Sequence, residues 1–223
     1  MNAASNPFVD VVSCVIAFLI GSIPFGYVIG RIFFSTDLRA QGSGNIGAMN
    51  ALRTLGKGGA VSVLLLDVLK GAIPIIVGRL LFGTTDESAQ WLLAAMGTSA
   101  VLGHCFSPWL GWKGGKGVAT SLGVIAAMSW QAGLIFVLAW IIGGLVLTQY
   151  SSVGSMLANV VSPFALWFFT GSLPLTAYGI FAAFFIIWTH RENIARLQAG
   201  SENRISFFRG KGSSRTGPYQ GGS

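Results

Sequence analysis

The chain has 223 residues, of which 52% are hydrophobic and only 9% are charged. Soluble domains usually carry about 25% charged residues, so this composition excludes a soluble globular surface and indicates a membrane protein. The formal net charge is +7, which fits either basic cytoplasmic loops or an anionic ligand. The positions of the charges along the chain have to separate these two interpretations.

Seven apolar segments are long enough, or nearly long enough, to cross a bilayer as helices. The first has no basic region before it and no small-residue cleavage site after it, which favours a retained span over a signal peptide. The fourth is short, so 118–149 could instead form one long element. The candidate spans lie near residues 8–33, 59–82, 90–108, 118–129, 132–149, 153–170 and 173–190.

The distribution of charge favours seven spans, with the N-terminus outside and the C-terminus in the cytoplasm. In that arrangement the outer loops carry Asp86 and Glu87 and no basic residue. A single span over 118–149 would move the basic tail outside, against the positive-inside rule. We therefore predict an all-α, polytopic integral membrane protein with seven transmembrane helices. Its inner loops and tail would hold Arg39, Arg53, Lys57, Lys113, Lys116, Arg191, Arg196, Arg204, Arg209, Lys211 and Arg215.

The predicted organisation is one transmembrane domain over 1–205 and a tail over 206–223. The tail is rich in Gly, Ser and basic residues, a composition typical of disorder. Neither a disulfide nor a metal site is expected, because Cys14 and Cys105 lie in apolar runs and the two histidines are far apart in the sequence.

The second span contains an acidic and a basic residue. Asp67 and Lys70 are three positions apart and therefore share one helical face. Ionisable groups within a membrane face the protein interior or a polar cavity. The pair fits a structural ion pair or a role in shaping a site, and the sequence leaves both open.

The first loop that suggests chemistry is GSGNIGAMN at 42–50, followed by Arg53. Glycines let backbone amides approach a ligand closely, and successive N–H groups can form an anion-binding nest. The side chains of Ser43, Asn45 and Asn50 would add hydrogen bonds, and Arg53 a forked donor suited to phosphate. The run is not a Walker A loop, and a flexible loop of ordinary turn residues remains the alternative.

The second is KGGKGVAT at 113–120, which leads directly into an apolar helix. Helix N-termini attract anions through free N–H groups and the helix dipole. Topology alone would need the charge of Lys113 and Lys116 but not three glycines within five residues. The pattern therefore favours a phosphate site formed by the two lysines with Gly114 and Gly115 between them.

The third combines YSSVGS at 150–155 with HRENIAR at 190–196. His190 and Asn193 are three apart on one helical face, and Ser155 lies at the inner end of the sixth span. The histidine fits a base, a donor to phosphate, or an interfacial residue without chemistry. All three loops fall on the inner face under a topology fixed by charge, which predicts a phosphorylated ligand at the cytoplasmic surface.

Taken together, these strings resemble the bacterial acyl-phosphate-dependent glycerol-3-phosphate acyltransferases, the PlsY family. The resemblance runs from GSIP at 21–24 to about Leu197, which is nearly the whole chain. Family members typically have Pro or Val at the position of Ile46 and Thr at that of Met49. The matching strings are GSGNIGAMN with Arg53, LLLDVLKG, LGHCFSPWLGWKGGKGVAT, YSSVGS and HRENIARL.

The resemblance implies transfer of a fatty acyl group from acyl phosphate to the sn-1 hydroxyl of glycerol 3-phosphate. The products are lysophosphatidic acid and inorganic phosphate, in an early step of phospholipid biosynthesis. It further implies a site facing the cytoplasm in the bacterial plasma (inner) membrane, contact with membrane lipid, no cofactor and no nucleic acid. A functional link to an enzyme that forms acyl phosphate follows from the donor.

The resemblance also assigns roles by position. It implies His190, Lys116 and Asn193 as catalytic residues, with His190 and a phosphate oxygen of the donor as alternative bases. A transporter of phosphorylated metabolites is the competing interpretation, although the sequence shows neither an internal repeat nor a polar path. The implied substrate-binding residues are Ser43, Asn45, Asn50, Arg53, Lys113, Gly114, Gly115, Thr120 and Ser155.

Overall fold

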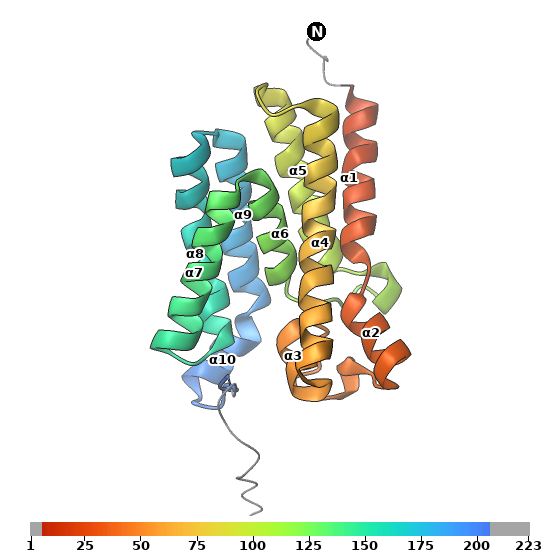
Figure 1. Ribbon diagram of the computed structural model, residues 1–223, viewed down its shortest axis with the longest axis vertical. Helices are drawn as coiled ribbons and strands as arrows, with labels where there is room; N and C mark the ends of the chain where they lie inside the picture. The colour runs from red at the N-terminus through yellow and green to blue at the C-terminus, as the bar shows by residue number, and fades with distance from the viewer. Residues whose placement is uncertain (1–5, 206–223) are drawn as a thin grey trace, which may run out of the picture.

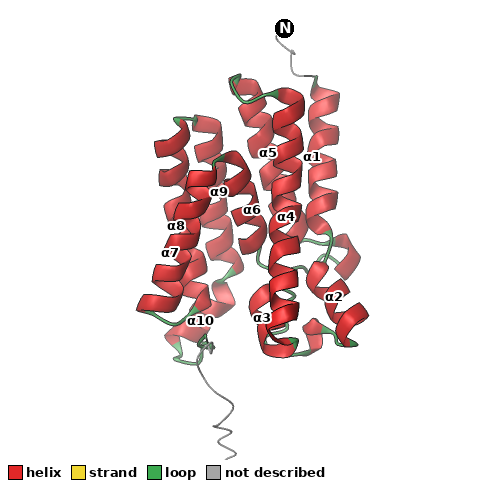
Figure 2. Cartoon of the chain, viewed as in Figure 1, coloured by secondary structure: helices red, strands yellow, loops and turns green. Residues whose placement is uncertain are grey.

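The computed structural model describes residues 6–205, and within them every regular element is a helix (Figures 1 and 2). The predicted tail over 206–223 lies outside the described residues, and the extent of the domain remains a prediction. The elements are α1 (Pro7–Ser22), α2 (Phe25–Phe34), η1 (Leu38–Ala40), α3 (Ala48–Thr54), α4 (Gly56–Phe82), α5 (Glu87–Cys105), η2 (Pro108–Leu110), α6 (Val118–Met128), α7 (Trp130–Trp140), the π-helix η3 (Ile141–Leu147), α8 (Ser151–Thr170), α9 (Leu173–Thr189) and α10 (Arg191–Gln198).

Four stretches of the described chain are long and apolar enough to cross a membrane: Pro7–Phe34, Gly56–Phe82, Trp130–Leu147 and Ser151–Thr170. The pair α9 and α10, bent by 55°, would raise this number to five if it formed one span. The all-α, membrane-type fold is thus as predicted, whereas the count of seven spans and the placement of the termini stay predictions.

The predicted first span, 8–33, is divided into two helices at Ile23 and Pro24. Proline has no N–H to donate and disfavours the helical region for the residue before it. Ile23 accordingly has ψ of 119°, outside the helical region. The break matters for function because α2 turns away from α1 toward the loops at one end of the bundle (Figure 1).

The segment 118–149 is divided at Ser129 into α6 and a second stretch made of α7 and the π-helix η3, in preference to one long element. The side chain of Ser129 caps α7 by accepting a hydrogen bond from the Ala132 amide at 3.3 Å. From α4, Arg79 donates to the carbonyls of Ala127 and Met128 at the end of α6. A cation at the C-terminus of a helix satisfies free carbonyls and complements the dipole, which helps to explain why α6 stops there.

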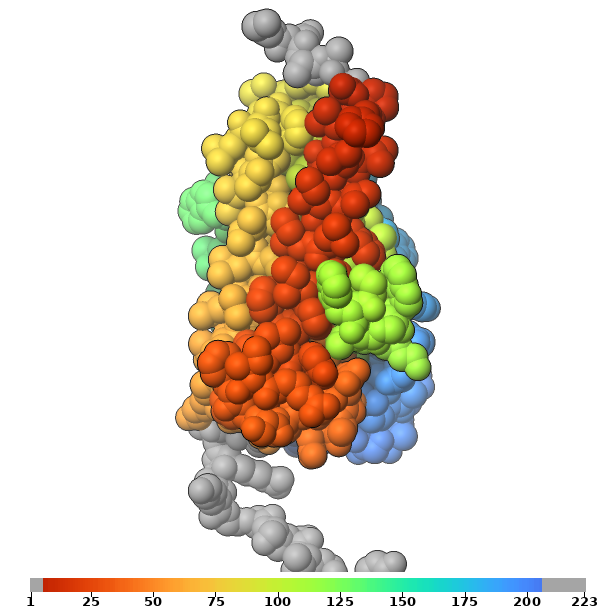
Figure 3. Space-filling model, turned by 90° about the vertical axis from the view of Figure 1, so that its right-hand side faces the viewer, coloured from red at the N-terminus to blue at the C-terminus, as the bar shows by residue number. Residues whose placement is uncertain are grey.

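The helices pack through small residues, as is usual in membrane bundles. At Gly71 an added Cβ would overlap the Thr120 backbone of α6, and at Gly21 it would overlap the Ala100 backbone of α5. Large apolar side chains face outward, including Leu80, Phe168 and Phe184 at 74–81% exposure. Their exposure fits contact with lipid, since water would not favour it. The segment after α5 projects from the bundle beside the junction of α1 and α2 (Figure 3).

Candidate active site

The candidate site lies at the end of the bundle that carries α2, α3 and α10, here called the site end (Figure 1). At its centre Lys116 donates through Nζ to Oδ1 of Asn193, and Nδ2 of Asn193 donates to Oε1 of Glu202 at 2.7 Å. Ser152 Oγ donates to the same carboxylate oxygen at 3.1 Å, and Arg196 Nε to the other at 2.8 Å. Three distant segments therefore meet here: Ser152 and the α10 region surround the Glu202 carboxylate, and Lys116 reaches it through Asn193.

The charges in this cluster act on one another. Desolvation lowers the pKa of Lys116 to about 8, with the neighbouring charge of Arg196 adding to the effect. Arg53 interacts electrostatically with the same cluster. Desolvation lowers the pKa of Arg53, and the charge of Glu202 raises it. Burial raises the pKa of Glu202, but hydrogen bonds from Asn193 and Arg196 outweigh burial and leave the pKa below its usual value. Three cations around one ionised carboxylate leave an excess of positive charge suited to phosphate.

Glu202 is the site residue that the sequence reasoning missed. Its side chain is only 6% exposed, although it lies four residues beyond the end of α10. The nearest signal in the sequence was the mixed charge around Glu202 and Arg204 directly before the Gly- and Ser-rich tail. Nothing in that pattern indicates that the chain turns back between α8 and α10.

The loop over 42–50 is held together by Asn50, which is 2% exposed. Its Nδ2 donates to the carbonyls of Leu38, Gln41 and Asn45 at 2.8–3.0 Å. Its Oδ1 accepts from the Ser43 amide at 2.9 Å. Asn50 thus orders the loop from within, while the exposed side chain of Ser43 remains available to a ligand.

The remaining candidates in this loop are arranged differently from one another. Asn45 accepts from the Gly47 amide at 2.8 Å, which forms a local turn before α3. Gly42 has φ of 56°, and an added Cβ would meet Asn50 Oδ1, so glycine is required by both conformation and space. Arg53 follows in α3, and within the described residues its guanidinium makes no hydrogen bond.

The glycines of the second loop have a structural use that the sequence did not indicate. The amide of Gly114 donates to the Cys105 carbonyl at 2.9 Å, and that of Gly115 to the His104 carbonyl at 3.1 Å. These N–H groups, which were expected to face phosphate, are used to fix the loop on the end of α5. An added Cβ at Gly115 would overlap the imidazole ring of His104. Direct contact of either glycine with phosphate stays a prediction.

The loop is also tied to α9 and prepares the start of α6. Thr189 Oγ1 donates to the Lys116 carbonyl at 3.1 Å. Gly117 has φ of 85° and forms the N-cap of α6 without a side-chain cap. Thr120, in the first turn, is fully buried, and its hydroxyl has no partner among residues 6–205. Lys113 is exposed.

His190 follows the last residue of α9 and is 3% exposed. Its Nδ1 lies 2.8 Å from the Ile186 carbonyl, which can only accept, so Nδ1 carries a proton. In the neutral ring Nε2 is then an acceptor. Ser155, 5% exposed, donates to the Ser151 carbonyl of its own helix at 2.8 Å.

Five of the predicted residues fall into two groups. Lys116, Asn193 and Arg53 share one electrostatic cluster with Arg196 and Glu202. The positive charge of Lys116 also acts on the imidazole of His190. Asn50 and Ser155 make their hydrogen bonds within the scaffold. In the described residues, 6–205, no group of three His, Cys, Asp or Glu side chains could hold a metal ion, and Cys14 and Cys105 are free thiols.

Comparison with known proteins identifies the family of the chain. Residues 11–200 match the family described as glycerol-3-phosphate acyltransferase. A glycerol-3-phosphate acyltransferase of Synechococcus sp. (strain JA-2-3B'a(2-13)) is 46% identical over 188 residues, covering 84% of this chain and 90% of the relative. One from Bradyrhizobium diazoefficiens is 42% identical over 194 residues, covering 87% and 94%.

Two solved structures have the same fold. Both are crystal structures of PlsY (YgiH), an integral membrane glycerol 3-phosphate acyltransferase. The glycerol 3-phosphate form is 39% identical, with a TM-score of 0.81, and covers 88% of this chain and 96% of its own. The lysophosphatidic acid form is 38% identical, with a TM-score of 0.79, and covers 88% and 95%. This chain belongs to the glycerol-3-phosphate acyltransferase family.

Proposed function

We propose that this protein transfers a fatty acyl group from acyl phosphate to the sn-1 hydroxyl of glycerol 3-phosphate. The observation that carries the proposal is the excess of positive charge around Lys116, Arg53 and Arg196 at one end of an apolar bundle. Both substrates of this reaction carry a phosphate group. An enzyme for it must hold two anions close together at the surface of a membrane that supplies the acyl chain.

The proposed reaction does not require the protein to form a covalent bond with a substrate. In the proposed step the sn-1 oxygen attacks the acyl carbon, the bond from that carbon to the phosphate oxygen breaks, and inorganic phosphate leaves. The acyl phosphate is already activated, so no acyl-enzyme intermediate is required. Placement of the two substrates and stabilisation of the developing negative charge remain as the contributions of the site.

We assign charge stabilisation to Lys116 and Arg53, with Asn193 fixing the position of the Lys116 ammonium group. The bond from Asn193 Nδ2 to Glu202 leaves Asn193 Oδ1 facing Lys116, which supports this role. Ser43, with its exposed side chain, is assigned to phosphate binding together with Lys113. Arg196 supports the arrangement through its bond to Glu202.

The proton of the attacking hydroxyl passes either to His190 or to a phosphate oxygen of the donor. The Nδ1–H tautomer of His190 leaves Nε2 able to accept a proton or a hydrogen bond. The variant His190→Gln separates the two routes. Near-complete loss of turnover with glycerol 3-phosphate still bound supports the base; a modest loss with a raised KM supports the phosphate route.

The donor is tested directly with the purified protein in lipid mesophase or detergent. Glycerol 3-phosphate is supplied with palmitoyl phosphate, and separately with palmitoyl-CoA, and lysophosphatidic acid is measured. Product from the phosphate donor alone is expected. Product from palmitoyl-CoA alone would overturn the proposed donor while leaving the family assignment intact. Analysis of the product by its acyl position tests the sn-1 assignment.

The same proposal predicts the membrane in which the enzyme lies and the source of its donor. We place it in the bacterial plasma (inner) membrane, with the site facing the cytoplasm, because the described basic loops gather at the site end. Its donor has to come from an enzyme that forms acyl phosphate, since a mixed anhydride of this kind hydrolyses readily in water. Cysteine labelling at Ser88 and at Lys113 in intact cells would test the orientation.

A further inference from the structure

A buried charged network lies beside the site and has no role in the mechanism above. Asp67 and Lys70 of α4 are each 2% exposed, and Lys70 Nζ lies 2.8 Å from Asp67 Oδ1. His104, at the end of α5, is 3% exposed, with Nδ1 3.8 Å from the same carboxylate oxygen. Ionisable groups buried in a membrane bundle are costly and need a reason to be there.

One arm of the network reaches the break between α1 and α2. Lys70 Nζ donates to the Ile23 carbonyl at 2.7 Å, where Pro24 interrupts the helix. The helix beyond this break, α2, packs on the first loop of the site, because an added Cβ at Gly26 would overlap the Ile46 carbonyl. A hydrogen bond at residue 23 therefore holds the helix that supports the loop over 42–50.

The other arm reaches the second loop of the site. The His104 carbonyl accepts a hydrogen bond from the Gly115 amide, and the imidazole ring of His104 lies beside Gly115. The three atoms nearest to an added Cβ at Gly115 all belong to the imidazole of His104. The position of this ring thus limits the position of the residue directly before Lys116.

Both arms start from α4, and α4 also continues directly from α3, the helix of Arg53. The same helix is therefore joined to Arg53 through the chain, and its Asp67 carboxylate lies 3.8 Å from the ring of His104, which in turn contacts the Lys116 loop. Rigid placement of charges relative to one another is what a site for two phosphates needs. A displacement of about 1 Å can cost about 100-fold in rate.

We propose that Asp67, Lys70 and His104 are positioning residues, which set the Lys116 loop and the α1–α2 break on α4 and thereby fix the spacing of the phosphate-binding groups. The competing interpretation is an ion pair that stabilises the fold only. The proposal rests on the proposed function for its turnover readout but not for its binding readout.

The first test replaces the charged pair by neutral groups of similar shape, Asp67→Asn with Lys70→Met. Removing both partners avoids an uncompensated buried charge, which makes this double variant milder than either single one. A positioning role predicts that the melting temperature stays close to that of the parent while KM and Kd for glycerol 3-phosphate rise about tenfold. The matched control is Gln90→Leu with Ser172→Ala, which removes a polar pair bonded at 2.6 Å at the opposite end.

The second test uses the contact between His104 and Gly115. Gly115→Ala should raise KM for glycerol 3-phosphate, because the new methyl group overlaps the imidazole ring. If the ring positions the loop, His104→Ala alone should also raise KM, and the double variant His104→Ala with Gly115→Ala should lose clearly less than the two single losses combined, because both changes act on one contact. A parental KM in His104→Ala, or losses that combine in full in the double variant, would overturn the positioning role of His104.

Titration calorimetry with glycerol 3-phosphate keeps the two proposals apart. An inactive parent that still binds glycerol 3-phosphate would count against the proposed acyl donor, while the affinities of the variants would still report on the network. A folded double variant, Asp67→Asn with Lys70→Met, that keeps the parental KM and Kd would overturn the role of the pair.

Discussion

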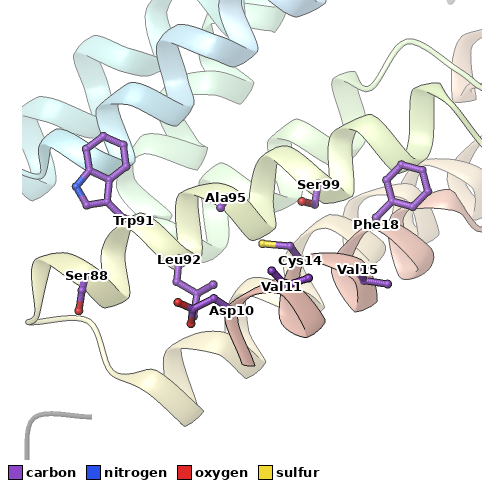
Figure 4. Close-up of a pocket in the computed structure, with 10 residues that line it drawn as sticks. All are labelled: Asp10, Val11, Cys14, Val15, Phe18, Ser88, Trp91, Leu92, Ala95 and Ser99. Carbon is purple, nitrogen blue, oxygen red and sulfur yellow. The ribbon is translucent and has the colours of Figure 1, made fainter. Parts of the chain in front are cut away.

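The two ends of the bundle differ in how they use polar groups and open space. At the site end His190 and Asn193 are buried, and each has a hydrogen-bond partner. Toward the other end a groove of about 680 Å³ lies between α1 and α5, lined mostly by apolar side chains (Figure 4). Among the described residues that line it, Asp10 is the one with a charged side chain. An acyltransferase that binds two phosphates needs cations, so charge and bonded partners indicate the site better than volume does.

The largest effect is expected from Lys116→Met. The ammonium group bonds to Asn193 and lies among the other cations of the site, so its loss should lower kcat/KM roughly 1,000-fold. Lys113→Met is the comparison within the same loop, because the exposed Lys113 should contribute less to phosphate binding than the partly buried Lys116. It should cost less than about tenfold. Similar losses in the two variants would show that the loop contributes charge without a defined position.

Glu202→Gln should have the next largest effect. The carboxylate accepts from Asn193, Arg196 and Ser152, and hydrogen bonds to a charged group are worth about 1.5–3 kcal/mol each. We expect kcat/KM to fall roughly 10- to 100-fold, because glutamine has no charge and only one acceptor oxygen, whereas Asn193 and Arg196 bond to the two different oxygens of Glu202. Glu192→Gln, an exposed residue of α10, is the control and should behave like the parent. Equal behaviour of the two variants would exclude Glu202 from the site.

Affinity for glycerol 3-phosphate should weaken as the pH rises through about 8, the value to which desolvation lowers the pKa of Lys116. A lysine is charged below its pKa, so the cation is present at pH 7 and lost at pH 9, and Kd should rise by up to about tenfold per pH unit. A bound phosphate favours the charged form, so the corresponding limb in kcat should lie at higher pH.

Lys116→Met should lack this dependence over the same range, and Lys116→Arg should move it upward, because arginine stays protonated throughout. Isothermal titration from pH 6.5 to 9.5 measures the affinities. A parental Kd that stays constant between pH 7 and 9.5 would contradict the assignment of Lys116 to phosphate binding.

The smallest effect is expected from filling the groove between α1 and α5 with Ala95→Leu. Ala95 lines the groove and is exposed, so the larger side chain can be accommodated (Figure 4). Turnover and KM for glycerol 3-phosphate should stay within about twofold, because substitutions at exposed positions usually change little. A loss as large as that of Glu202→Gln would mean that the groove takes part in the reaction.

The sequence by itself determined the helical membrane character, the separation of α6 from α7, and the basic, glycine-rich loops of the site. These features are local, because hydropathy, proline, glycine and charge act within a few residues along the chain. The sequence also carried the family resemblance, since Lys116, His190 and Asn193 lie in short strings within the region that matches the family.

Only the tertiary structure decided how these groups are used. It placed Glu202 between α8 and α10, and it bonded the amides of Gly114 and Gly115 to carbonyls at the end of α5. It also joined Lys70 to the carbonyl of Ile23, 47 positions away. The physical reason is that a hydrogen bond between distant segments depends on which helices pack together, and hydropathy does not encode that choice.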